Sequence, residues 1–87
     1  MLEMVTPTGA LPPRAVQFLD VPAEGGRLTI LARHQPMVCL LRAGTVVARD
    51  AEGAEEQWTI RSGTLTVERG GVTLLTRHLA PIPPRPS

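Results

Sequence analysis

The chain has 87 residues, 43% of them hydrophobic and 20% charged, with a formal net charge of +1. This length and composition fit one globular domain with a modest core, and the single cysteine excludes an internal disulfide. Because nine arginines are spread among eight acids, and only Phe18 and Trp58 are aromatic, the chain lacks the basic patch and stacking platform of a nucleic-acid binder.

Turn-forming residues recur about every eight to twelve positions, which is typical of an all-β sandwich or barrel. The pattern predicts a small, flattened sandwich of about eight to ten short, mainly antiparallel strands and no substantial helix. In chain order, the principal strands are expected at residues 2–6, 14–21, 28–31, 37–42, 45–49, 56–61, 64–68 and 72–76.

Two of these segments alternate strictly between polar and apolar residues. Alternation has the period of a strand with one buried face. It predicts inward side chains at Trp58, Ile60, Leu65 and Val67. In the segment 14–21, Val16 and Phe18 are expected to share a face.

A helix competes with the strand assignment in only one place. Ala51, Ala54 and Trp58 have helical spacing. Gly53 weakens a helix there by about 1 kcal/mol. Alternation from Gln57 onward favours a hairpin turn followed by a strand.

The chain ends in a proline-rich segment, with four prolines between positions 81 and 86. Each proline removes an amide donor, so this segment favours polyproline II structure or disorder. We therefore expect one domain over residues 1–80 and a flexible tail over residues 81–87. A ligand for a proline-recognition domain is an alternative interpretation of the same prolines.

Residues that carry chemistry are sparse. His34, His78 and Cys39 have no metal-ligand spacing, and Cys39 fits a small buried hydrophobe. The Gly-Gly pairs lack the Lys-Ser/Thr of a phosphate loop. The acids at positions 52, 55 and 56 fit a solvated turn rather than an acid–base pair. The sequence thus predicts no catalytic residue, no metal and no cofactor.

The most specific stretch runs from residue 24 to residue 44. It contains, in order, the glycine turn Glu24-Gly25-Gly26-Arg27, an apolar strand, the corner Arg33-His34-Gln35-Pro36, a second apolar run, and the turn Arg42-Ala43-Gly44. This order resembles the amino-terminal domain of the epsilon subunit of F-type ATP synthases, whose corner usually reads Gly-His-Ala-Pro. The resemblance spans residues 2 to about 80, including the opening Leu-Glu-Met-Val-Thr-Pro-Thr-Gly and the later Ser-Gly-Thr-Leu-Thr-Val.

The resemblance implies a β-sandwich that joins the rotor stalk, binds the gamma subunit and seats the stalk on the c-ring, without being an enzyme itself. It implies that Gly25, Gly26 and Arg27 face the c-ring. It implies that Arg33, His34, Gln35, Pro36 and Arg42 face gamma, on a different surface. Arg27 stands where the family usually has an acid.

The family's carboxyl-terminal helical pair, which holds nucleotide in some members, has no counterpart in this sequence, so ATP binding is not expected. No apolar run approaches the roughly 20 residues of a membrane helix, and the amino terminus lacks the regions of a signal peptide. We expect a soluble, cytoplasmic protein that reaches the inner face of the cell membrane only through the synthase complex.

Three alternatives stay open. His34 fits a corner histidine that hydrogen-bonds nearby backbone as well as it fits a gamma contact. The use of arginine with no lysine fits codon bias, or a docking face suited to carboxylates. A stand-alone regulatory or ligand-binding β-module derived from the same fold is the alternative function, because fold alone does not fix function.

Overall fold

The computed structural model describes residues 1–31 and 36–83. Within these ranges the chain forms ten strands and no helix. The strands are β1 (Leu2–Thr6), β2 (Gly9–Ala10), β3 (Phe18–Ala23), β4 (Gly26–Leu31), β5 (Met37–Leu41), β6 (Gly44–Arg49), β7 (Glu55–Ile60), β8 (Gly63–Glu68), β9 (Gly71–Thr76) and β10 (Leu79–Ile82).

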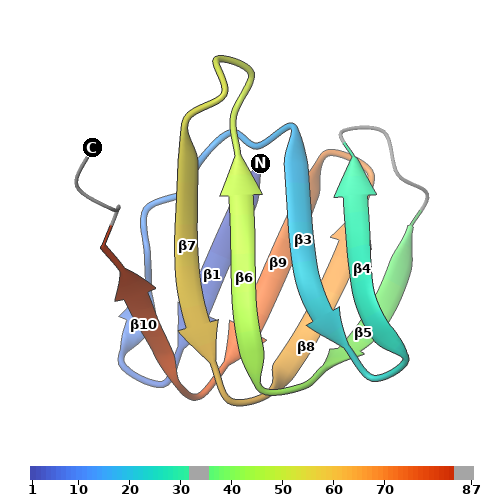
Figure 1. Cartoon of the computed structure of the whole chain (residues 1–87), viewed down its shortest axis with the longest axis vertical. Coiled ribbons are helices and arrows are strands. Elements are labelled where there is room, and N and C mark those ends of the chain that lie inside the picture. Colours follow the sequence, from blue (N-terminus) through green and yellow to red (C-terminus); the bar gives the residue numbers. More distant parts are fainter. Residues whose placement is uncertain (32–35, 84–87) are drawn as a thin grey trace.

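The strands form one continuous hydrogen-bonded sheet that folds over itself into two layers (Figure 1). The front layer has the order β10-β7-β6-β3-β4, and the rear layer has the order β5-β8-β9-β1-β2. Ala23 pairs with Leu41 to join β3 to β5, and the amide of Arg42 donates to the Pro22 carbonyl at 2.7 Å. All strand pairs are antiparallel except β1 with β9. The all-β sandwich predicted from the sequence is confirmed.

The core lies between the layers and follows the two-residue period of the strands. Trp58, Ile60, Leu65 and Val67, predicted to point inward, are each at most 4% exposed. They pack with the other buried apolar residues, which are Leu2, Met4, Leu19, Val21, Ile30, Leu41, Val46, Ala48 and Leu74. Cys39 is half-buried and packs against this cluster, in agreement with its prediction as a small hydrophobe. Close packing of this kind makes the domain stiff.

The segment 14–21 differs from its prediction. β3 begins only at Phe18, and Arg14 forms an isolated bridge with Leu2. Val16 packs against the core, whereas Phe18 lies on the outer face, 4.6 Å beneath the Arg49 guanidinium. The predicted shared face is therefore wrong. The regular alternation of β3 is set by its ladders with β4 and β6, and both ladders begin only at Phe18.

The last strand, β10, includes residues 81 and 82, which the sequence predicts to belong to the tail. β10 pairs with β7 along the edge of the front layer, where Pro81 lies opposite Trp58 and Ile82 opposite Gln57. An edge strand tolerates proline because one side of it needs no amide donor. The division into a domain over residues 1–80 and a tail over residues 81–87 stays a prediction, and residues 84–87 lie outside the described ranges.

The turn before β7 is a hairpin rather than a helix. The Asp50 carboxylate accepts the amides of Glu52 and Ala54, both at 2.9 Å. This side-chain closure is a turn device that competes with helix formation. The hairpin turn and strand predicted from the alternation starting at Gln57 are therefore confirmed in place of the competing helix.

Candidate docking surfaces

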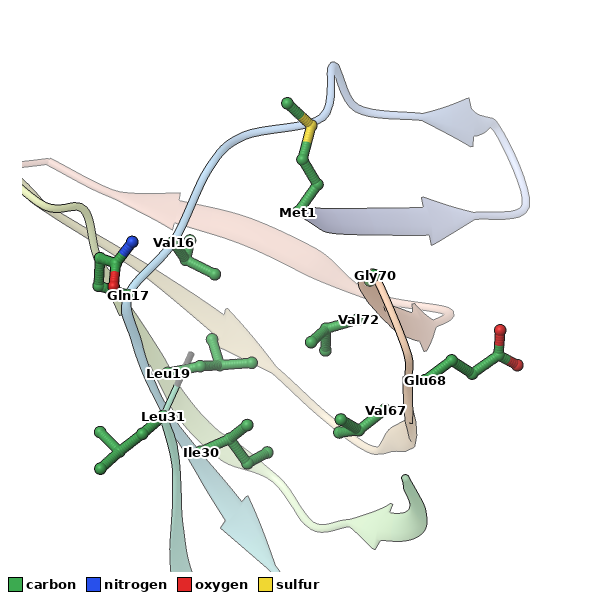
Figure 2. A pocket seen from close by; sticks show the side chains of 11 residues that line it. Met1, Val16, Gln17, Leu19, Ile30, Leu31, Val67, Glu68, Gly70 and Val72 are labelled. Atoms are coloured by element: carbon green, nitrogen blue, oxygen red, sulfur yellow. The ribbon is translucent and has the colours of Figure 1, made fainter. Parts of the chain in front are cut away.

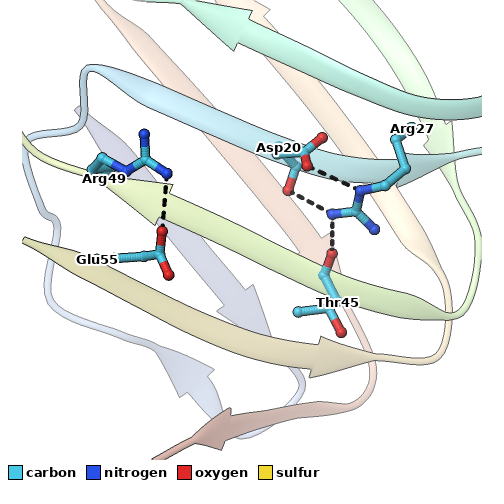
Figure 3. Close-up of polar contacts among 5 residues, drawn as sticks. All are labelled: Asp20, Arg27, Thr45, Arg49 and Glu55. Carbon is cyan, nitrogen blue, oxygen red and sulfur yellow. Dashed lines mark hydrogen bonds and ion pairs between the residues drawn. The ribbon is translucent and has the colours of Figure 1, made fainter. Parts of the chain in front are cut away.

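Charged side chains on the outer face of the front layer pair with one another (Figure 3). The Arg49 guanidinium lies 3.0 Å from the Glu55 carboxylate. The Arg27 guanidinium lies 3.0 Å from the Asp20 carboxylate, and it donates to the Thr45 carbonyl at 2.7 Å. Arg27 thus spans from β4 across β3 to β6. These ion pairs engage both guanidinium groups within the domain, whereas Oδ1 of Asp20 is buried without a hydrogen-bond partner among the described residues.

One of these carboxylates has a perturbed pKa. A hydrogen bond from Gln57, followed by one from Arg49, holds the pKa of Glu55 below its usual value near 4.5. Because the folded pKa is lowered, these contacts stabilise the fold above about pH 4.5, and the stabilisation is lost as the pH falls through the lowered pKa.

We expect Gln57→Ala to move the Glu55 titration toward higher pH, since the donor that favours the carboxylate is removed. The measurement is an NMR titration of the Glu55 side chain in the two proteins. Gln17→Ala, an exposed glutamine outside this contact, is the matched control and leaves the titration in place. An identical Glu55 titration in the Gln57 variant would contradict the assignment.

The outer face of the rear layer exposes large apolar side chains instead. Val38, Leu40 and Leu75 point outward from β5 and β9 and are 69%, 57% and 53% exposed. In the register of the sheet, Leu40 lies beside Thr64, Thr64 beside Leu75, and Leu75 beside Val5. We call the surface formed by Glu3, Val5, Val38, Leu40, Thr64, Thr66, Thr73 and Leu75 the rear face, in which Glu3 lies beside Thr73.

A groove of about 570 Å³ continues the rear face toward the turns at its lower end in Figure 1. Leu40 and Leu75 supply apolar walls, and Glu24 and Arg77 supply charged groups. The other lining residues are Thr6, Pro7, Leu41, Ser62, Gly63, Thr64 and Thr76. An apolar surface bordered by polar groups is typical of a protein–protein contact.

The glycine turn lies at the same lower end, between β3 and β4. Gly25 and Gly26 are exposed, and Gly26 has a φ of 126°, which favours glycine. Arg42 was predicted for the other surface but lies here. Its guanidinium is 3.4 Å from the Glu24 carbonyl, and it lines a shallow hollow with Gly26 and Arg27.

Of the residues predicted to face gamma, the structure describes only Pro36 and Arg42, and it places them at opposite ends of β5. Pro36 is exposed and precedes β5, whereas Arg42 follows it, so a strand of five residues separates them. Arg33, His34 and Gln35 lie outside the described residues. The structure instead joins Arg42 to the glycine turn.

Sequence reasoning missed the exposed residues of the rear face. The run 37–41 is apolar throughout, so periodicity could not separate the outward Val38 and Leu40 from their inward neighbours. The segment 72–76 reads Val-Thr-Leu-Leu-Thr and does not alternate either, so the sequence did not mark Leu75 as outward.

The alternative function, a stand-alone ligand-binding β-module, would need a binding pocket, and Figure 2 shows a small pocket of the domain. It has a volume of about 160 Å³ and lies between the layers, with Leu19, Ile30, Val67 and Val72 among its lining residues. Figure 2 shows the Glu68 carboxylate pointing away from these apolar side chains. In the described ranges, no group of three or more His, Cys, Asp or Glu residues is placed to hold a metal ion.

One sheet folded into two packed layers defines a small β-sandwich, and the large apolar side chains exposed on one outer face make that face a candidate docking surface. No helix in residues 1–31 and 36–83 is long and apolar enough to span a membrane. Residues 1–81 match the family described as the ATP synthase Delta/Epsilon chain, beta-sandwich domain. The chain belongs to this family.

Individual relatives agree with the family match. The ATP synthase epsilon chain 2 of Burkholderia orbicola is 36% identical over 88% of this chain and 51% of its own length. The ATP synthase epsilon chain of Mesorhizobium japonicum is 30% identical over 84% of this chain and 54% of its own. The chain thus spans about half the length of the curated relatives it matches.

The fold is shared with solved structures. A chain of the Euglena gracilis mitochondrial ATP synthase, solved with OSCP, F1 and the c-ring, superimposes with a TM-score of 0.85. The match covers 92% of this chain and 51% of that one, at 22% sequence identity. At this identity the likeness concerns the fold alone.

Proposed function

We propose that this protein is a central-stalk subunit of an F-type ATP synthase, a non-catalytic part that couples ion translocation to ATP synthesis or hydrolysis. In this proposal the rear face binds the gamma subunit, and the end with the glycine turn meets the c-ring. Family membership supports the assignment to the complex. The observation that carries the gamma contact is the exposure of three large apolar side chains on one sheet face.

The contrast between the two faces supports this orientation. The front face engages two of its guanidinium groups internally, Arg27 with Asp20 and Arg49 with Glu55. The rear face exposes apolar side chains to water, and covering them is favourable by roughly 25 cal/mol per Å². The rear face therefore gains more from a protein partner than the front face does.

The remaining predicted contacts stay proposals. Gly25, Gly26 and Arg27 are proposed for the ring, and Arg42 joins them because of its place beside Glu24. Pro36 is proposed for the gamma side, together with Arg33, His34 and Gln35 from the corner. The protein would act at the cytoplasmic face of the membrane, held there by these partners rather than inserted into the bilayer.

ATP is expected to leave the melting temperature unchanged, because the sequence contains no phosphate loop. A ligand at about 100 times its Kd stabilises a native protein by about 2.7 kcal/mol, which would raise Tm by roughly 10–20 °C for a domain of this size. Thermal unfolding with and without millimolar ATP and magnesium distinguishes these outcomes. A clear rise specific to ATP would contradict the expectation that this chain binds no ATP, without bearing on the stalk assignment.

Affinity capture from the native organism tests the proposed function. A tagged copy of the chain should recover the gamma subunit and the c-ring. A wash that contains excess untagged chain should not release these subunits from the tagged copy. Recovery of the chain without any synthase subunit would overturn the proposal. That result would favour the stand-alone module.

A further inference from the structure

Three arginines from three different turns lie at one end of the sandwich. The pairs Leu41 with Gly63 and Gly63 with Thr76 place the β5–β6, β7–β8 and β9–β10 turns at the same end of their strands. The glycine turn lies at that end too, and Figure 1 shows all four turns along the lower edge. The first three turns carry Arg42, Arg61 and Arg77, all exposed. We call these three residues the basic end.

Acidic side chains gather at the opposite end of the strands. The β6–β7 turn carries Asp50 and Glu52, and Glu68 is the last residue of β8. Arg69 lies at this end too, in the β8–β9 turn, but only the basic end gathers arginines from three turns. The sequence alone shows only scattered arginines.

The three arginines also differ from the others in their partners. Arg14, Arg27 and Arg49 each form an ion pair at 3.0 Å with an acid of the same domain. Among the residues that the structure describes, none of the three arginines of the basic end forms such a pair. Arg42 makes only a 3.4 Å contact with the Glu24 carbonyl. Their charges are available to a partner.

We infer that the basic end recognises an acidic protein loop, with carboxylates of the c-ring's exposed loops as the groups bound. This inference rests on the proposed function and states the chemistry of its ring contact. Guanidinium groups suit carboxylates because two N–H donors match two oxygens. Neighbouring strands lie about 4.8 Å apart, so the turns hold these side chains within reach of one loop.

An anionic bilayer is the less fitting partner. Lipid recognition typically uses clusters of about four to eight basic residues, whereas this end has, in the part of the chain that the structure describes, three arginines outside an ion pair, with Glu24 among them. The fourth, Arg27, adds less charge, because Asp20 and Thr45 already engage its guanidinium. Arg42, Arg61 and Arg77 therefore supply most of the charge in the proposed contact with a ring loop, and Arg27 lies at its border.

The test compares how variants of the 87-residue chain bind to the purified c-ring of the same organism, held in lipid nanodiscs. Arg42→Glu, Arg61→Glu and Arg77→Glu should each weaken binding about tenfold at low salt, and rising salt should weaken the wild type. Arg69→Glu is the matched control, since Arg69 is exposed in the β8–β9 turn at the opposite end. It should change binding less than twofold.

The outcomes separate this inference from the proposed function. Wild-type binding that is insensitive to salt and to all three reversals would overturn the acidic-loop contact while leaving the stalk assignment intact. Equal binding to empty nanodiscs containing phosphatidylglycerol would also overturn it, in favour of lipid. If the wild type bound neither the ring nor purified gamma, the proposed function would be refuted, and this inference with it.

Discussion

Leu75→Asp should lower the affinity of the chain for the gamma subunit by about a hundredfold or more. Leu75 is 53% exposed and lies between Thr64 and Val5 in the register of the rear layer. In the proposed complex this position is covered by gamma. Burying an unpaired carboxylate there costs several kcal/mol, and each 1.4 kcal/mol is a factor of about ten in Kd.

Isothermal titration calorimetry of purified chain and gamma measures this effect. Ile82→Asp is the matched control, because Ile82 is also apolar and exposed (37%) but belongs to β10 at the edge of the front layer, away from the residues proposed to face gamma. Both variants should keep the wild-type melting temperature within a few degrees, since neither position is buried. If the Ile82 variant lost as much affinity as the Leu75 variant, or neither lost any, the rear face would not be the gamma contact.

Gly63→Ala should destabilise the fold by about 3 kcal/mol. A Cβ added at Gly63 would lie 2.5 Å from the Leu75 carbonyl oxygen and 3.2 Å from the Thr76 Cβ. Both neighbours belong to β9, which is hydrogen-bonded to β8 and paired with β1. The backbone cannot move aside without breaking these ladders, so the sheet must open locally.

The corresponding fall in melting temperature is roughly 10–20 °C for a domain of this size. Gly25→Ala provides the control, because no atom lies within 4 Å of a Cβ built there and its φ is not in the left-handed region. Thermal unfolding followed by circular dichroism should show a change of only about 2 °C for that variant. A Gly63→Ala protein as stable as the wild type would mean that β8 and β9 approach less closely.

The parts of the fold that could be predicted from the sequence are those that depend only on the local sequence, such as the direction of a side chain in a strand or the place of a turn. The alternation predicted that Trp58 and Leu65 point into the core, because a strand with one solvent-exposed face buries every second side chain. The hairpin after Arg49 followed from Asp50 and Gly53, whose local chemistry closes the turn. Neither inference needs knowledge of which strands are neighbours.

The parts that the sequence did not predict depend on neighbours. Val38 and Leu40 look like core residues until β5 is placed in a sheet whose outer face has no covering layer. Arg42 and Arg77 are far apart in the chain, and only the register through Gly63 brings their turns together. Pro81 enters a strand because β7 offers it an edge position.

The most direct test of the central claim is a photo-cross-link from the rear face within the assembled synthase. A benzophenone amino acid at the position of Leu40 should form an adduct with gamma on irradiation. The same probe at the position of Thr59, which is exposed on β7 of the front layer, should not. Gamma adducts from position 59 but none from position 40 would show that the apolar rear face is not where this subunit meets the stalk.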